Sequence, residues 1–162
     1  IFLDQRINRK WVGEVSRSSQ RILNTFAYTG AFSVMAAKAG ATTTTVDLSK
    51  TYLNWGWENF EANGLDPDEH FGVKGDAIEW LGAFAKKGRT FHGIVLDPPT
   101  FSRSGKSTFR TDSNYTDLAR LAADALEAAA HAHEAAAAEG ERATSVAHAP
   151  NLCQRSAPLA VR

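Results

Sequence analysis

Short hydrophobic runs alternate with longer segments of helical character along the first hundred residues. The runs are rich in β-branched or aromatic side chains, which is typical of strands. Four strands are predicted, at residues 21–26, 42–47, 70–75 and 91–97. The junctions between these strands lack the turn residues of a hairpin, so the pattern does not favour an antiparallel arrangement.

The segments between the predicted strands begin and end as helices do. Residues 31–40 end on a glycine, and residues 49–64 begin on Ser49, a good N-cap, and end on Gly64. Residues 76–88 begin on an aspartate and end on two lysines and a glycine, which suits the helix dipole. This order of elements predicts an α/β fold, a mostly parallel sheet with helices on both faces.

The pattern changes in the last part of the chain. Residues 119–138 are rich in alanine and are predicted to form a helix, and residues 143–149 are a candidate fifth strand. Residues 150–162 have no clear pattern. We therefore expect an N-terminal lead-in at residues 1–20, an α/β domain at residues 21–149 and an irregular tail.

Composition narrows the class of protein. The 162 residues suffice for one hydrophobic core, and the 18 basic and 18 acidic side chains cancel, so a nucleic-acid partner would need a local basic patch. A single cysteine, Cys153, excludes an internal disulfide, and no apolar run is long enough to span a membrane. We expect a cytoplasmic protein without a metal site, of unknown oligomeric state. The start at Ile1 is typical of a piece of a larger protein, whose earlier part would carry a transit peptide if the protein is organellar.

Three aspartates follow the predicted strands at one edge of the sheet. Asp47, Asp76 and Asp97 stand at the ends of the second, third and fourth strands. In open parallel sheets, ligands bind beyond these carboxyl ends. Because neighbouring carboxylates repel one another, a polar ligand with hydroxyl and amine groups is the economical explanation.

The loop after the first strand indicates which ligand this is. It holds one glycine, Gly30, where a dinucleotide fingerprint holds three, so a nucleoside without a pyrophosphate fits better. Asp47 lies 17 residues later, where an acidic residue reaches a ribose diol, and Asp76 is placed to meet an adenine edge. S-adenosylmethionine is therefore the predicted cofactor.

Five ordered motifs carry a resemblance to a known family. They are FLDQR (2–6), RILNTFAYTGAFSV (21–34), TTTVDLSKTYLNWGWENFEANGLD (43–66), GDAIEWL (75–81) and VLDPPTFSRS (95–104). Together they resemble the Rossmann-like class I methyltransferases that modify large-subunit ribosomal RNA, the bacterial enzymes that make 7-methylguanine or 5-methylcytosine in 23S rRNA. The third motif is more similar to the guanine-N7 branch. The C-terminal part departs from the family, as a divergent or truncated chain without the last strands would.

The resemblance implies residues that bind the cofactor. The loop under its methionine part would consist of Asn24, Phe26, Tyr28, Thr29 and Gly30. The ribose and adenine would be held by Asp47, Leu48, Ser49, Asp76 and Ala77. A segment that closes over the site would include Asp4, Gln5 and Arg6, and Arg6 could pair with the cofactor carboxylate. For Asp47 and Asp76, a helix cap is the simpler alternative role.

The resemblance also implies residues that face the acceptor base. Asp97, Pro98 and Pro99 would lie beside the sulfonium, and Phe101 would stack on the base. The basic residues that follow would either contact RNA phosphates or only be solvated, and they are Arg103, Lys106 and Arg110.

The tryptophans within the predicted helices have two possible roles. Trp55, Trp57 and Trp80 could pack a helix onto the sheet or offer a stacking surface to a base. The helical positions favour packing for all three.

The acceptor atom depends on how it becomes nucleophilic. Methylation of cytosine C5 needs a cysteine thiolate, whereas guanine N7 already has a lone pair. No cysteine lies at residues 97–104, and the surroundings of Cys153 do not match a catalytic motif. Guanine N7 is thus favoured by elimination. Two alternatives stay open, an inactive cofactor-binding domain that serves as an RNA-binding scaffold and an NAD-dependent oxidoreductase.

Overall fold

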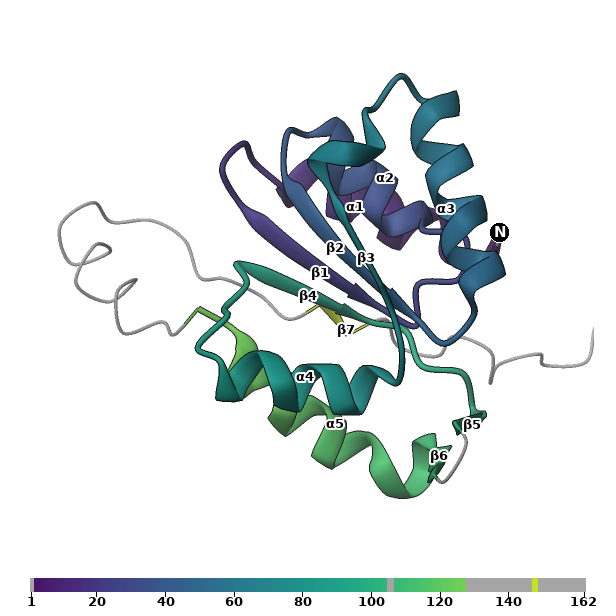
Figure 1. Cartoon of the computed structure of the whole chain (residues 1–162), viewed down its shortest axis with the longest axis vertical. Coiled ribbons are helices and arrows are strands. Elements are labelled where there is room, and N and C mark those ends of the chain that lie inside the picture. Colours follow the sequence, from purple (N-terminus) through teal and green to yellow (C-terminus); the bar gives the residue numbers. More distant parts are fainter. Residues whose placement is uncertain (1, 105–106, 128–146, 149–162) are drawn as a thin grey trace, which may run out of the picture.

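A five-stranded parallel sheet lies at the centre of the computed structural model (Figure 1). The structure describes residues 2–104, 107–127 and 147–148. The strands run in the order β3-β2-β1-β4-β7. Their bounds are β1 (Arg21–Thr25), β2 (Thr42–Asp47), β3 (Phe71–Lys74), β4 (Gly93–Leu96) and β7 (Ala147–His148).

Helices cover both faces of this sheet (Figure 1). One face carries α1 (Arg6–Val15), α2 (Ala31–Lys38) and α3 (Lys50–Ala62), and a 3-10 turn, η1 (Pro67–Glu69), precedes β3. The opposite face carries α4 (Ala77–Lys86) and α5 (Thr111–Ala125). The chain moves outward from β1 to β3 and then crosses back to β4, on the other side of β1. This reversal between β1 and β4 is a topological switch point, where α/β sheets bind ligands.

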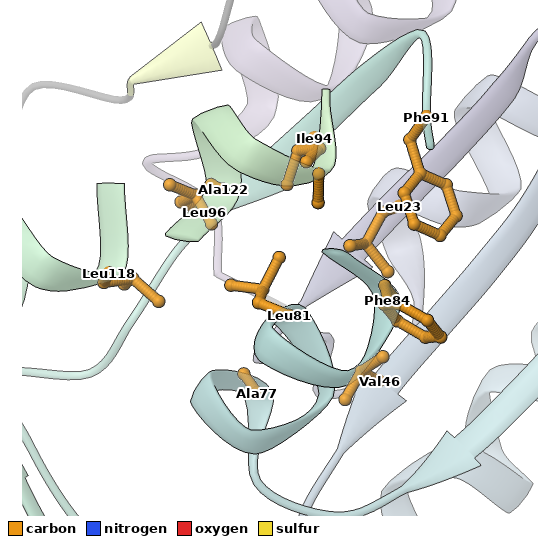
Figure 2. Packing of buried hydrophobic residues seen from close by; sticks show 11 residues of the cluster. Leu23, Val46, Ala77, Leu81, Phe84, Phe91, Ile94, Leu96, Leu118 and Ala122 are labelled. Carbon is orange, nitrogen blue, oxygen red and sulfur yellow. The ribbon is translucent and has the colours of Figure 1, made fainter. Parts of the chain in front are cut away.

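Hydrophobic packing explains why β4 is apolar throughout. Ile94 and Leu96 point into the cluster under α4 and α5, whereas Val95 joins a second cluster with Val12 and Phe32 on the opposite face. A strand covered on both faces buries every side chain. Figure 2 shows the first cluster, whose buried members are Leu23, Val46, Ala77, Leu81, Phe84, Phe91, Ile94, Leu96, Leu118, Ala122 and Ala125.

The predicted α/β fold is confirmed, with all four predicted strands and the three helices between them. Helix α1 and the hairpin formed by two short strands were not predicted. Helix α1 lies within the expected lead-in. Its only buried residue is Val12, so the hydrophobic pattern of this segment is too weak to predict a helix that packs on the core. Strands β5 (Phe101–Ser104) and β6 (Ser107–Arg110) pair as an antiparallel hairpin in a segment where no strand was expected. The Gly-Lys pair between them is a hairpin signal that the prediction missed.

The last part of the chain agrees with the prediction only in places. Helix α5 begins at Thr111, eight residues before the predicted start at 119, and ends at Ala125. The fifth strand is present as β7, which pairs with β4 in parallel. The remainder of the two predicted elements, at residues 128–138 and in the flanks of β7, lies outside the described residues, as does the tail at 150–162. None of the described helices is long and apolar enough to cross a membrane.

Candidate functional site

A cavity of about 590 Å³ opens at the switch point, beyond the carboxyl ends of β1, β2 and β4. Its volume lies within the range of about 300–1,000 Å³ that is usual for ligand pockets. Four segments after strands and the residues before α1 form its wall. The lining residues are Phe2, Asp4, Gln5, Phe26, Tyr28, Val46, Asp47, Leu48, Ser49, Tyr52, Gly75, Ala77, Asp97, Pro98, Pro99 and Thr100.

The loop between β1 and α2 has an unusual backbone at this cavity. Phe26 and Tyr28 adopt φ angles of 54° and 49°, a conformation that side chains other than glycine rarely take. Gly30, the N-cap of α2, has φ 68°, and a Cβ there would lie 3.3 Å from the Cα of Gly56 in α3. Glycine is therefore required for the close approach of this loop to α3. Strained non-glycine residues of this kind gather at functional sites.

Asp47 fixes this loop against the end of β2. Its Oδ2 accepts a hydrogen bond from the backbone N–H of Tyr28, and its Oδ1 accepts one from the N–H of Ser49, both at 2.8 Å. The N-cap of α3 is Ser49, whose Oγ accepts from the N–H of Tyr52 at 3.3 Å. Asp47 is thus not the helix cap. A carboxylate has about four acceptor sites, so capacity remains for hydroxyl groups in the cavity.

Asp97 is tied to the segment around α1. The side-chain amide of Gln5 donates to Asp97 Oδ1 at 3.2 Å, and Asn8 donates to the Oε1 of Gln5 at 2.7 Å, which fixes the orientation of that amide. Burial raises the pKa of the Asp97 carboxyl above its ordinary value, the charge of Asp4 raises it further, and Arg9 partly opposes the shift. A perturbed carboxyl that lines a cavity is a candidate functional group.

A smaller cavity of about 30 Å³ adjoins the first and shares Asp97 with it. Arg9 lines it, together with Thr29 and with Ala31, the first residue of α2. An arginine beside a helix N-terminus makes this corner favourable for an anion. Arg6, the residue predicted for that role, is exposed and lines neither cavity.

Most of the residues predicted to bind the cofactor line the larger cavity. They are Asp4, Gln5, Phe26, Tyr28, Asp47, Leu48, Ser49, Ala77 and Asp97, and the predicted acceptor-side residues Pro98 and Pro99 join them. Thr29 lines only the smaller cavity.

Arg6, Gly30, Asn24 and Asp76 line neither cavity. Asn24 is buried, and its Nδ2 donates to Ser33 Oγ at 3.0 Å. Asp76 caps α4, because its Oδ1 accepts from the N–H of Ile78 at 2.8 Å, so Gly75 and Ala77 form the wall there instead.

The remaining predicted residues belong to the hairpin after the proline pair. Phe101 and Arg103 lie on β5 and Arg110 lies on β6, where Phe101 is paired with Arg110 in the ladder. Lys106 lies outside the described residues.

The sequence prediction did not include several residues that the structure places at the site. Arg9 and Asn8 are on the same face of α1 as Gln5, at the i, i+3 and i+4 spacing of a helix. That spacing was visible in the sequence, but residues 1–20 were not interpreted as a helix. Phe2 and Tyr52 both contact Tyr28, with ring centroids 5.4 and 4.6 Å away.

The donor set of the cavity fits an adenosine group with a charged tail. Asp47 offers acceptors for a ribose diol, and Leu48 and Ala77 provide apolar surface for a purine. Arg9 and the N-terminus of α2 provide positive charge for a carboxylate. Among the described residues, no group of three or more His, Cys, Asp or Glu side chains could hold a metal ion.

Comparison with known proteins agrees with this geometry. Residues 1–132 match a family described as S-adenosylmethionine-dependent methyltransferase. The ribosomal RNA large subunit methyltransferase K of Neisseria meningitidis serogroup B is 50% identical over 107 residues, which are 65% of this chain and 30% of that protein. A methyltransferase K/L of Allochromatium vinosum is 42% identical over 130 residues, which are 78% of this chain and 17% of that protein.

A solved structure is also similar. The protein SMU.776, solved in complex with SAH, is 38% identical and superposes with a TM-score of 0.74, over 79% of this chain and 34% of that one. This chain therefore spans about a third or less of the length of these relatives. The match over most of its own length shows that the chain belongs to the family of S-adenosylmethionine-dependent methyltransferases.

Proposed function

We propose that this protein transfers the methyl group of S-adenosylmethionine to a base of large-subunit ribosomal RNA. The proposal rests mainly on one observation, that Asp47 and Asp97 line the same cavity at the switch point of the sheet. The relatives with 42% and 50% identity, which bear the name of large-subunit rRNA methyltransferases, support the choice of substrate.

We propose that the chain's own residues would hold the cofactor in the larger cavity and its smaller neighbour. Asp47, which lines the cavity, would accept hydrogen bonds from the ribose hydroxyls, and Leu48 and Ala77 would contact the adenine. Arg9, which lines the smaller cavity, would pair with the carboxylate of the methionine part, in the role that the sequence had given to Arg6. When bound, the cofactor supplies a methyl group on a sulfonium, which reacts by in-line displacement.

The wall after β4 faces the acceptor base. Pro98 and Pro99 have no backbone N–H, so the polar groups of this wall are hydrogen-bond acceptors. They are the proline carbonyl groups and the carboxylate of Asp97. Gln5 and Asn8 hold that carboxylate in place. Methyl transfer of this type depends mainly on position and electrostatics.

Guanine N7 is the acceptor atom that we propose, with cytosine C5 as the second candidate. N7 has its own lone pair and needs neither a thiolate nor a general base. None of the residues that line the described cavity is a cysteine, and Cys153 lies outside the described residues. The third sequence motif supports the same choice.

A transfer assay tests the proposal. The protein is incubated with tritiated S-adenosylmethionine and 23S rRNA, with 16S rRNA as the matched control, and the digested nucleosides are identified by mass spectrometry. We expect label in 23S rRNA alone, as 7-methylguanosine. Label as 5-methylcytidine would overturn the choice of atom. If the protein binds the cofactor but transfers no methyl group, the proposed enzyme activity is wrong and the protein is an RNA-binding scaffold.

A further inference from the structure

Two aromatic side chains continue the wall of the cavity onto the exposed surface of α3. Tyr52 lines the cavity, and its ring contacts that of Tyr28 at a centroid distance of 4.6 Å. The ring of Tyr52 also contacts that of Trp55 at a centroid distance of 5.8 Å, with the ring planes 37° apart. The indole of Trp55 is 44% exposed and Tyr52 is 37% exposed. A continuous row of rings therefore leads from the cavity to the surface.

Trp55 differs from the other tryptophans for which the sequence predicted helix packing. Trp57 meets Phe60 edge to face at 5.3 Å and covers Gly72 so closely that a Cβ there would collide with its indole. Trp80 packs beside Phe84, and its indole N–H donates to the carbonyl of Lys74 at 3.4 Å. Packing is thus the role of Trp57 and Trp80, and the prediction fails for Trp55.

The position of Trp55 on α3 explains this difference. The buried face of the helix consists of Leu53, Gly56 and Phe60. Trp55 lies outside that face, so its exposed surface does not contribute to the core. A single exposed aromatic residue needs no explanation, but a pair in ring contact at the rim of a ligand cavity indicates a binding surface.

The charges near the pair are mixed, because the first turn of α3 carries a basic residue whereas the exposed Glu58 lies one turn beyond Trp55. Lys50 begins α3, the first turn contains no acidic residue, and Thr51 and Asn54 are exposed beside the rings. The positive end of the helix dipole lies at the same turn. Exposed aromatic rings on which bases can stack are typical of surfaces that bind single-stranded nucleic acid.

We propose that Tyr52 and Trp55 form a stacking site for an unpaired base of the substrate RNA, next to the nucleotide that enters the cavity. This inference rests on the proposed function, since it assigns a further contact to the same substrate. Sequence-specific RNA recognition commonly uses splayed bases stacked on aromatic side chains. Because the rings of Tyr52 and Trp55 continue from the mouth of the cavity, the base next to the target nucleotide could stack on them.

Steady-state methylation of 23S rRNA by the Trp55→Ala variant tests the site. We expect KM for the RNA to rise about 5- to 100-fold, as the loss of one stacked base predicts, with Kd for S-adenosylhomocysteine and Tm unchanged. Trp55→Phe should retain most of the affinity. Trp11→Ala is the matched control, because Trp11 is 37% exposed on α1 and lines neither cavity.

Fluorescence separates stacking from a structural effect. Excitation of tryptophan should show quenching on addition of saturating rRNA in the wild-type protein, and Trp55→Phe should lose this component while it still binds. If Trp55→Ala methylates with an unchanged KM, the stacking site is wrong and the proposed function stands. If the wild-type protein methylates no RNA, both proposals fail. Equal losses in Trp55→Ala and Trp11→Ala would also overturn the stacking site.

Discussion

The carboxylate of Asp47, at the end of β2, accepts a hydrogen bond from the backbone N–H of Tyr28 at 2.8 Å. Tyr28 has a φ angle of 49°, which an isolated tyrosine would avoid. The bond therefore stabilises a strained loop in the shape that lines the cavity. One side chain thus holds the wall of the site and also presents acceptors to the ligand.

Replacement of Asp47 by alanine should weaken both the fold and the site. Two backbone N–H groups lose a charged acceptor, so we expect the free energy of unfolding to fall by about 1–3 kcal/mol. The affinity for S-adenosylhomocysteine should fall at least about 10-fold, because hydrogen bonds to a charged group contribute about 1.5–3 kcal/mol. Urea denaturation and calorimetric titration measure the two effects.

Asp66→Ala provides the matched control for that variant. Asp66 caps η1, where its Oδ1 accepts from the N–H of Asp68 at 3.0 Å, and it lines neither cavity. The loss of this cap should cost about 0.5–2 kcal/mol of stability and leave ligand affinity unchanged. An Asp47→Ala variant that binds S-adenosylhomocysteine as the wild type does would contradict the assigned role.

Asp97→Asn should stabilise the protein at neutral pH and lower its activity. The pKa of Asp97 is raised in the folded state, chiefly by burial, so between the unfolded and folded pKa values the folded state binds more protons. Stability contributed by this group consequently falls as the pH rises through that window. Asparagine has no charge to bury, and it keeps the acceptor for Gln5.

Thermal unfolding as a function of pH measures this effect. The difference in Tm between Asp97→Asn and the wild type should be positive at pH 7 and should vanish as the pH falls below the ordinary pKa of aspartate. Asp117→Asn is the control, since Asp117 is 66% exposed and pairs with Arg120 on the surface, where an ion pair contributes at most about 1 kcal/mol. A lower Tm for Asp97→Asn at neutral pH would refute the argument.

The order of strands and helices could be predicted because burial on both faces leaves a clear sequence pattern. β4 is apolar throughout and α3 begins at a good cap, and both signals are local. The carboxyl ends of parallel strands meet at one edge, so Asp47 and Asp97 could be placed together before the structure was known. The structure shows both of them in one cavity.

The side-chain direction of residues after the strands could not be predicted in the same way. Asp47 is the last residue of β2 and Asp76 lies two residues after β3, yet Asp76 turns back to cap α4. A carboxylate finds hydrogen-bond donors in either arrangement, facing the cavity or capping the helix. Only the packing of the loop in the folded protein decides between them. The choice between Arg6 and Arg9 as the partner of the cofactor carboxylate depends on helix α1. This helix buries only Val12, whereas its apolar residues Ile7 and Trp11, and Leu3 just before it, are exposed. A helix with an exposed apolar stripe gives a misleading amphipathic pattern.

Arg9→Ala should weaken binding of S-adenosylhomocysteine by about 10- to 100-fold through loss of a charged pair with its carboxylate. Adenosine, which lacks that carboxylate, should bind both proteins equally. Arg6→Ala is the matched variant, because Arg6 lies on the same helix outside both cavities, and its affinity should stay within about twofold of the wild type. Calorimetry with both ligands distinguishes the two arginines. If Arg6→Ala shows the larger loss, the sequence-based role of Arg6 is restored.

Asn24 and Ser33 should show energetic coupling in a double-mutant cycle. Both are buried, and Asn24 donates to Ser33 Oγ at 3.0 Å, which in turn lies 2.8 Å from Thr45 Oγ1. This chain of bonds joins β1, α2 and β2 beneath the strained loop. Asn24→Ala should lower the free energy of unfolding by about 1–3 kcal/mol, since it leaves a buried hydroxyl with one partner fewer.

The coupling energy between Asn24→Ala and Ser33→Ala should be about 0.5–1.5 kcal/mol by urea denaturation. Ser16→Ala supplies the control pair with Asn24→Ala, because Ser16 is also buried but donates to the carbonyl of Val12 in α1. That pair should be additive within about 0.5 kcal/mol. Because Asn24 does not line the cavity, its loss should reduce ligand affinity less than Asp47→Ala does. The reverse order would assign Asn24 a direct contact with the cofactor, as the sequence motif had predicted.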